Sequence, residues 1–309
     1  LEMRMHKAMS VIQFKVEGQI IKKNPGFHLE DRNLLDKIDY ERGVITLDGK
    51  EYEMLDINFP TIDPKHPYAL SKDEEEIMSR LESAFLNCEK LQDHMRFLLN
   101  KGGLYKVYNG NLLYHGCVPL KEDGTLKSVR LYGRSYKGKS LYEVLESYVR
   151  KGFYALNKKE KERGKDMMWY IWLSENSPLF GKDKMATFER YFLAEKETHK
   201  EKKNPYYNLL ENEKVINMIL KEFGLTEESA HIINGHVPVK VITGESPIKC
   251  NGKVLVIDGG FSRAYQKQTG IAGYTLIYNS YGLILAAHEP FESTEAAIEK
   301  ESDIHSDSV

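Results

Sequence analysis

Residues 112–119 read Leu-Leu-Tyr-His-Gly-Cys-Val-Pro, and residues 232–238 read Ile-Ile-Asn-Gly-His-Val-Pro. In both segments a short apolar run, typical of a strand, leads directly into a histidine that has a glycine beside it. A histidine at a strand end can project its imidazole into a cleft, and the glycine lets the backbone and a ligand approach closely. If the two strands are neighbours in a sheet, His115 and His236 suit a metal ion that takes nitrogen ligands. Taken singly, each histidine also fits a hydrogen-bonded structural role.

The composition is that of an ordinary globular protein. The 309 residues include 44 Lys and Arg against 46 Asp and Glu, and 41% of them are hydrophobic. This length supports one large domain or two small ones with a sizeable core. Because charges of both signs are spread along the chain, we expect no nucleic-acid partner. The longest apolar runs are far shorter than the roughly 20 residues of a spanning helix, so we expect no membrane partner either.

The three cysteines, Cys88, Cys117 and Cys250, are far apart and form no Cys-x-x-Cys pair. A disulfide framework and a zinc–thiolate site are therefore not expected. The chain has no signal-peptide pattern, and we predict a cytoplasmic location. It opens with Leu1 rather than methionine, which suggests a boundary within a longer protein.

Periodicity and turn residues predict a fold of the α+β or α/β class. Helices are expected at residues 3–23, 71–101, 140–151 and 212–223, and a hairpin at 43–52. The charge run at 158–165 is expected to be a solvated loop or a helix end. Strands are expected within 103–119 and at 231–233, 237–243, 253–258, 274–279 and 282–288.

One segment matches the phosphate-binding pattern G-x-x-x-x-G-K-[ST] at every position: Gly133-Arg-Ser-Tyr-Lys-Gly-Lys-Ser140. It lies between a possible strand and a helix, and Asp258 at the end of an apolar strand could help to hold magnesium. However, the preceding strand carries Arg130, whereas a central parallel strand should be continuously apolar. The residues between the glycines also include no further small residue. We therefore prefer a polar loop before a surface helix, with a nucleotide-binding protein as the alternative.

The chain resembles the Firmicutes-type (class III) fructose-1,6-bisphosphatases, which are calcineurin-like metallophosphoesterases. The histidine motifs look like the last two metal-ligand motifs of that superfamily, and the resemblance extends from residues 2–8 to the C-terminal third. It implies a two-sheet β-sandwich flanked by helices, and a two-metal, manganese-dependent phosphatase that hydrolyses fructose 1,6-bisphosphate to fructose 6-phosphate in gluconeogenesis. A phosphatase of another phosphate ester is the alternative within the superfamily. The most similar stretches are Gly235-His-Val-Pro-Val239, Gly244-Glu-Ser-Pro247, Gly252-Lys-Val-Leu-Val-Ile-Asp-Gly-Gly-Phe-Ser-Arg-Ala-Tyr265 and Thr269-Gly-Ile-Ala-Gly-Tyr-Thr-Leu-Ile-Tyr-Asn-Ser280.

The resemblance also implies roles for particular residues. His115 and His236 would bind the second metal of the pair. The loop at 172–184 resembles one that brings a basic residue to the substrate phosphate, with Lys184 as the first choice and Lys182 as the alternate. Arg263 and Tyr265 would contact the sugar bisphosphate from a strand-end loop. Asp258 fits a turn before Gly259 better than it fits support for a histidine.

The first three motifs of the superfamily, Asp-x-His, Gly-Asp-x-x-Asp-Arg and Gly-Asn-His-[Asp/Glu], are not found before His115. Asp63-Pro-Lys-His66 has the wrong spacing, and Asn111 is followed by leucine. We therefore expect a C-terminal part of the enzyme, with the catalytic residues and the other metal ligands elsewhere. Residues 1–102 would form an insert or cap, 103–291 the C-terminal part of the metallophosphatase domain, and 292–309 a polar tail. The expected partners are the missing N-terminal segment and, in a homo-oligomer, a second copy. The chain alone should be inactive.

Overall fold

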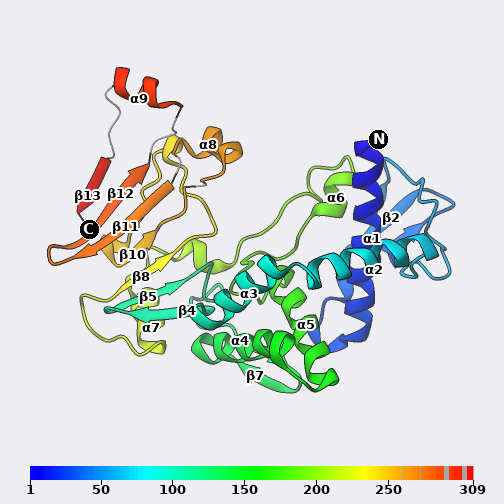
Figure 1. Cartoon of the computed structure of the whole chain (residues 1–309), viewed down its shortest axis with the longest axis horizontal. Helices are drawn as coiled ribbons and strands as arrows, with labels where there is room; N and C mark the ends of the chain where they lie inside the picture. The colour runs from blue at the N-terminus through cyan, green and yellow to red at the C-terminus, as the bar shows by residue number, and fades with distance from the viewer. Residues whose placement is uncertain (260, 272, 289–291, 301–304, 309) are drawn as a thin grey trace.

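The computed structural model describes residues 1–309 except 260, 272, 289–291, 301–304 and 309, and it leaves the side chains of residues 263 and 305–308 undescribed. Runs of helices and runs of strands follow one another along the chain, and the strands of the described part form sheets of five, three, three and two strands. The fold is therefore mixed α/β. Helix α1 lies at one end of the molecule, and the sheet that contains β11 and β12 lies at the other (Figure 1).

The five-stranded sheet occupies the middle of the fold and has the order β4-β5-β8-β10-β9. Its three central strands are parallel, with Leu112 opposite Ile232 and Ile232 opposite Val254. The edge strands β4 and β9 run antiparallel to them. Because the central strands are parallel, their carboxyl ends meet at the same edge of the sheet. The strands are β4 (Tyr105–Tyr108), β5 (Asn111–Tyr114), β8 (His231–Asn234), β9 (Ile248–Lys249) and β10 (Val254–Val256).

Both faces of this sheet are covered. On one face, Ile232 belongs to a core that includes Tyr142 of α4 (Gly138–Tyr154) and Ile219 of α7 (Glu213–Glu222). On the other face, Ile233 packs with Leu283 of a second, antiparallel sheet. Strands buried on both faces are typically continuous apolar runs, which is what residues 232–233 and 254–256 are. The second sheet consists of β11 (Gly273–Asn279), β12 (Gly282–His288) and β13 (His305–Ser308).

The N-terminal part has a core of its own, but later residues complete it. The Phe14 ring of α1 lies 5.3 Å from the ring of Phe188 in α6 (Thr187–Phe192). Ile21 of α1 packs with Tyr170 of α5 (Lys158–Leu173). Packing therefore crosses the boundary expected at residue 102. The elements of this part are α1 (Glu2–Lys23), β1 (Ile38–Asp39), β2 (Val44–Leu47), β3 (Lys50–Glu53), α2 (Lys72–Leu86) and α3 (Glu89–Lys101).

The structure corrects several expected elements. The helix expected at 71–101 is two helices, because Cys88 has an extended backbone conformation. The charge run at 158–165 is not a loop but the first half of α5, which begins where the Asn157 side chain accepts a hydrogen bond from the Glu160 backbone. Residues 237–243 are not a strand and end in a short 3₁₀ turn. The polar tail contains α9 (Thr294–Glu299) and β13, which pairs with β12.

Candidate functional site

The ends of the three parallel strands place two histidines and an aspartate at one edge of the sheet. His115 follows β5 directly, His236 lies two residues beyond β8, and Asp258 lies two residues beyond β10. The Gly235 backbone N–H donates to the carbonyl oxygen of His115 over 2.9 Å, which joins the first two strand ends. A Cβ atom added to Gly235 would lie 3.8 Å from a carboxylate oxygen of Asp258. The three side chains therefore belong to one strand-end cluster.

The structure brings the two imidazoles together. His115 Nε2 lies 2.9 Å from His236 Nδ1, and the ring centroids are 4.8 Å apart. The other nitrogen of His236, Nε2, lies 2.9 Å from the carbonyl oxygen of Phe180. A carbonyl oxygen can only accept, so this contact requires a proton on Nε2. In the neutral ring Nδ1 is then unprotonated, and its lone pair faces His115.

The surroundings favour the neutral form of both rings. Desolvation lowers the pKa of His115, and the negative charge of Asp258 offsets part of that effect. Desolvation also lowers the pKa of His236, and the neighbouring His115 lowers it further. Neutral imidazole is the form that binds metal ions, so the electrostatics suit a ligand role.

The spacing of the two nitrogens fits a shared metal ion. With metal–nitrogen bonds of about 2.1 Å, two ligands at right angles lie about 3 Å apart, which is close to the 2.9 Å observed. Within the part of the chain that the structure describes, no group of three or more His, Cys, Asp and Glu side chains could hold a metal ion. The described residues therefore offer two nitrogen ligands and the nearby charge of Asp258, but not a full coordination shell.

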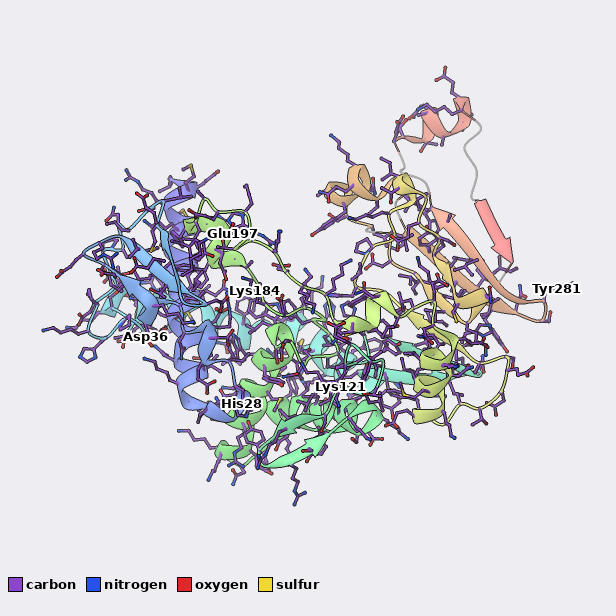
Figure 2. All side chains as sticks on the ribbon, turned by 180° about the vertical axis from the view of Figure 1, so that it is seen from behind. His28, Asp36, Lys121, Lys184, Glu197 and Tyr281 are labelled. Carbon is purple, nitrogen blue, oxygen red and sulfur yellow. The ribbon has the colours of Figure 1, made fainter. Side chains whose placement is uncertain are left out.

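The structure separates the two lysines of the 182–184 segment. Lys182 Nζ forms an ion pair with Glu201 over 2.8 Å, and its charge contributes to the lowered pKa of His236. Lys184 Nζ bonds to the carbonyl oxygen of Thr198 over 3.0 Å and lies 3.5 Å from the buried Glu189. Figure 2 shows Lys184 toward the N-terminal part of the molecule. Lys182 is thus the lysine whose charge reaches the histidine pair.

Helix α8 (Arg263–Thr269) carries the other two residues expected to contact substrate. Tyr265 is exposed on this helix, and its carbonyl oxygen accepts a hydrogen bond from Thr269. The backbone of Arg263 begins the helix, but its side chain lies outside the described residues.

The segment at 133–140 does not have the structure of a phosphate-binding loop. It contains β7 (Arg134–Tyr136), which pairs antiparallel with β6 (Val129–Leu131), whereas a phosphate-binding loop follows a central parallel strand. The start of α4 is already occupied, because a Glu222 oxygen accepts from the Lys139 backbone N–H over 3.1 Å. The Lys139 side chain is 43% exposed and lies near Glu143. The nucleotide-binding alternative is therefore not supported.

Sequence patterns missed two parts of the cluster. Asp258 is expected to form a turn, but the parallel pairing of β10 with β8 carries it to the same edge as the histidines. The apolar run before Asp258 was the signal that could have placed it there. The Phe180 contact is made by a backbone carbonyl, which leaves no residue-type signal in a sequence.

Comparisons with known proteins identify the family. The family model described as Firmicute fructose-1,6-bisphosphatase matches residues 1–309. A class 3 fructose-1,6-bisphosphatase of Alkaliphilus metalliredigens is 58% identical over 306 residues, which are 98% of this chain and 46% of the relative. One of Clostridium novyi is 57% identical over 307 residues, 99% of this chain and 46% of the relative. No solved structure matches. The chain spans about half the length of these relatives, and it belongs to the Firmicute fructose-1,6-bisphosphatase family.

Proposed function

We propose that the chain is part of a metal-dependent phosphatase that hydrolyses fructose 1,6-bisphosphate to fructose 6-phosphate and phosphate in gluconeogenesis. The observation that carries this proposal is the pair of imidazole nitrogens 2.9 Å apart at the carboxyl edge of a parallel sheet. The names of relatives that are 57–58% identical supply the substrate. The proposed location is the cytoplasm. In the described part of the chain, no helix is long and apolar enough to cross a membrane.

The proposed metal is manganese, held by His115 and His236 as part of a dinuclear site. When bound, such a metal pair neutralises charge on the phosphoryl oxygens and activates the attacking water. The chain's own contribution is to hold two neutral imidazoles in place, one of them through the hydrogen bond to Phe180. The finer fold assignment, a calcineurin-like β-sandwich, is part of the same proposal and is supported by the packing of Leu283 on the central sheet.

Basic side chains would bind the phosphate groups of the substrate. Lys182 is the best placed, because its charge already acts on His236. To bind a phosphate it would have to leave its ion pair with Glu201. Lys184, Arg263 and Tyr265 remain proposed substrate contacts, of which Lys184 requires the larger rearrangement.

The remaining metal ligands and the general acid are proposed to lie in the part of the relatives outside the match. More than half of each relative lies there. We propose that the matched half is the C-terminal one and that the other half is its partner. This proposal does not depend on the oligomeric state of the assembled enzyme. Two imidazoles without a bridging carboxylate form a weak, poorly charge-compensated site. The chain alone should therefore not turn over substrate.

The test is phosphate release from fructose 1,6-bisphosphate with Mn²⁺, measured for the chain alone and after the remaining part of the Alkaliphilus relative is added. We expect release only from the combination, and its loss in His236→Ala. Lys139→Ala is the matched control and should retain activity, because Lys139 lies on the surface of α4. Turnover by the chain alone would place the catalytic carboxylates within these 309 residues. A folded combination without turnover would contradict the proposed activity, and parallel assays with other phosphate esters would show whether the substrate alone is wrong.

A further inference from the structure

The loop at residues 174–181, called here the 174–181 loop, lies over both histidine segments. The carbonyl oxygen of Pro178 accepts a hydrogen bond from the Cys117 backbone N–H over 2.9 Å, two residues beyond His115. Gly116 makes this approach possible, because a Cβ atom there would lie 2.5 Å from the same oxygen. Two residues along the loop, the carbonyl oxygen of Phe180 contacts His236 Nε2. One short loop therefore holds both strand ends.

The buried hydroxyl of Ser177 helps to hold the loop in this shape. Ser177 is fully buried, and its Oγ donates to the carbonyl oxygen of Ile171 in the last turn of α5 over 2.5 Å. The same Oγ accepts from the backbone N–H of Leu179 over 3.1 Å and lies 3.4 Å from that of Phe180. The hydroxyl thus ties the backbone just before the Phe180 carbonyl, at the N–H groups of Leu179 and Phe180, to the end of a helix.

The C-terminal end of the loop, at Gly181, is also restrained. The Gly181 backbone N–H donates to the Ser177 carbonyl oxygen over 3.2 Å, and the Gly181 carbonyl oxygen accepts from Asn204 over 2.9 Å. Gly181 has a φ of 62°. A Cβ atom at this position would lie 2.8 Å from the Tyr207 hydroxyl, so the loop leaves no room for a side chain there.

We propose that Ser177 is a positioning residue that, through the Phe180 carbonyl, fixes the tautomer and orientation of His236. With the proton held on Nε2, the lone pair of Nδ1 faces His115 Nε2, 2.9 Å away. A ligand imidazole commonly donates its second nitrogen in this way, and loss of such a partner weakens metal binding about 10- to 100-fold. The metal consequence rests on the proposed function, but the tautomer itself exists without metal.

The test compares two variants that each remove one buried hydroxyl from the loop. Ser177→Ala removes the hydroxyl that orients Phe180. Ser174→Ala is the matched control, because Ser174 is also fully buried but its Oγ accepts from the Asn176 backbone N–H. Metal-free protein labelled with ¹⁵N-histidine is measured by NMR, with His236→Gln identifying the resonances. The unprotonated and protonated nitrogens of an imidazole are distinguished by their ¹⁵N shifts.

We expect a protonated Nε2 and an unprotonated Nδ1 in the original chain and in Ser174→Ala. In Ser177→Ala the two shifts should move toward each other, because both tautomers become populated, and Ser177→Thr should restore the original pattern. Gly116→Ala should also move the two ¹⁵N shifts, because its added Cβ would press on the Pro178 carbonyl oxygen of the same loop. Mn²⁺ binding, measured by the loss of the free-ion electron paramagnetic resonance signal, should weaken about tenfold or more in Ser177→Ala.

An unchanged tautomer in folded Ser177→Ala would overturn the proposal, as would an equal change in Ser174→Ala, which would reveal general loosening of the loop. If the tautomer shifts as expected but Mn²⁺ does not bind to any form, even with the other half of the relative present, the metal role of His236 fails and the positioning role stands.

Discussion

Lys182 and Lys184 are two residues apart, but their side chains have different surroundings. Lys182 pairs with Glu201, and its charge reaches His236, whereas Lys184 bonds to Thr198 in the N-terminal part. In the assembled enzyme, Lys182→Ala should therefore lower kcat/KM for fructose 1,6-bisphosphate about tenfold or more, the value of one charge-assisted hydrogen bond. Lys184→Ala should lower the midpoint of unfolding and lower kcat/KM less than Lys182→Ala does. The opposite pattern would make Lys184 the main substrate contact.

The buried Glu189 should make the free energy of unfolding depend on pH. Burial would raise its pKa, but hydrogen bonds from Arg32, at 2.7 and 3.1 Å, bring it below its ordinary value of 4.5. A carboxyl group whose pKa is lower in the folded state stabilises the protein above the unfolded value, and this contribution is lost as the pH falls through the folded value. The free energy of unfolding should therefore decline from about pH 5 downward. Glu189→Gln should flatten that decline in urea titrations between pH 6 and pH 3, and an equally steep decline would assign the acid sensitivity to other groups.

At the residue scale, a sequence predicts what side chains do better than what backbones do. The histidines could be found because imidazole beside glycine at a strand end is a visible pattern. The Phe180 carbonyl could not, because every residue has one and only the folded loop selects it. The preference for Lys184 over Lys182 is a choice between identical side chains, and only the folded structure shows that their acidic partners differ, Glu189 for Lys184 and Glu201 for Lys182.

At the scale of elements, helices α4 and α5 pack with their backbones close together. Gly152 and Gly164 face each other, and a Cβ atom on Gly164 would lie 2.1 Å from the Gly152 backbone nitrogen. Because the obstructing atom is backbone, the helices would have to separate. Gly164→Ala should lower the free energy of unfolding by about 3 kcal/mol. Gly26→Ala is the matched control, since nothing lies within 4 Å of its added Cβ, and it should change stability by less than about 0.5 kcal/mol in the same denaturant titration. Equal effects would show that helix packing is not the cause.

The element that periodicity predicted best is α7, which has a clear apolar stripe of buried residues. Helix α1 was also predicted, although Met5 and Met9 of its apolar pattern are exposed. The first half of α5 was missed because its charged residues carry no such stripe. The helix forms there because Asn157 caps it and its second half is anchored by Met167, Tyr170 and Ile171. Residues 237–243 alternate like a strand, but Lys240 instead donates its backbone N–H to the Glu245 side chain. Neither the Asn157 cap with its core anchor nor the Glu245 contact is visible in the periodicity of the segment itself.

At the scale of the molecule, the chain exposes an unusual amount of surface. Its accessible area is 18803 Å², whereas a monomer of 35.7 kDa typically exposes about 13,300 Å². Part of the excess is apolar: Phe85 and Leu86 of α2 are 61% and 62% exposed. Exposed apolar area of this kind favours association. We therefore expect the chain alone to self-associate as its concentration rises.

A charge on the exposed face of α2 should weaken this association. Phe85→Lys should shift the weight-average mass in sedimentation equilibrium toward the monomer, with the circular dichroism spectrum unchanged. Ser79→Lys is the control: it adds the same charge to α2 at a position about 120° around the helix from Phe85. Equal shifts in both variants would attribute the change to net charge, and no shift in either would place the contact elsewhere.

The core shared between α1 and α6 limits how this family can exchange parts. Phe188, Phe192 and Leu193 contribute to a cluster that is otherwise built from residues 11–68. A crossover that replaced residues 1–102 with the corresponding part of a relative would pack Phe188 and Phe192 against side chains from a different parent. Viable chimaeras should therefore be those in which residues 187–193 are inherited from the same parent as the N-terminal part, although about a hundred residues of sequence separate the two.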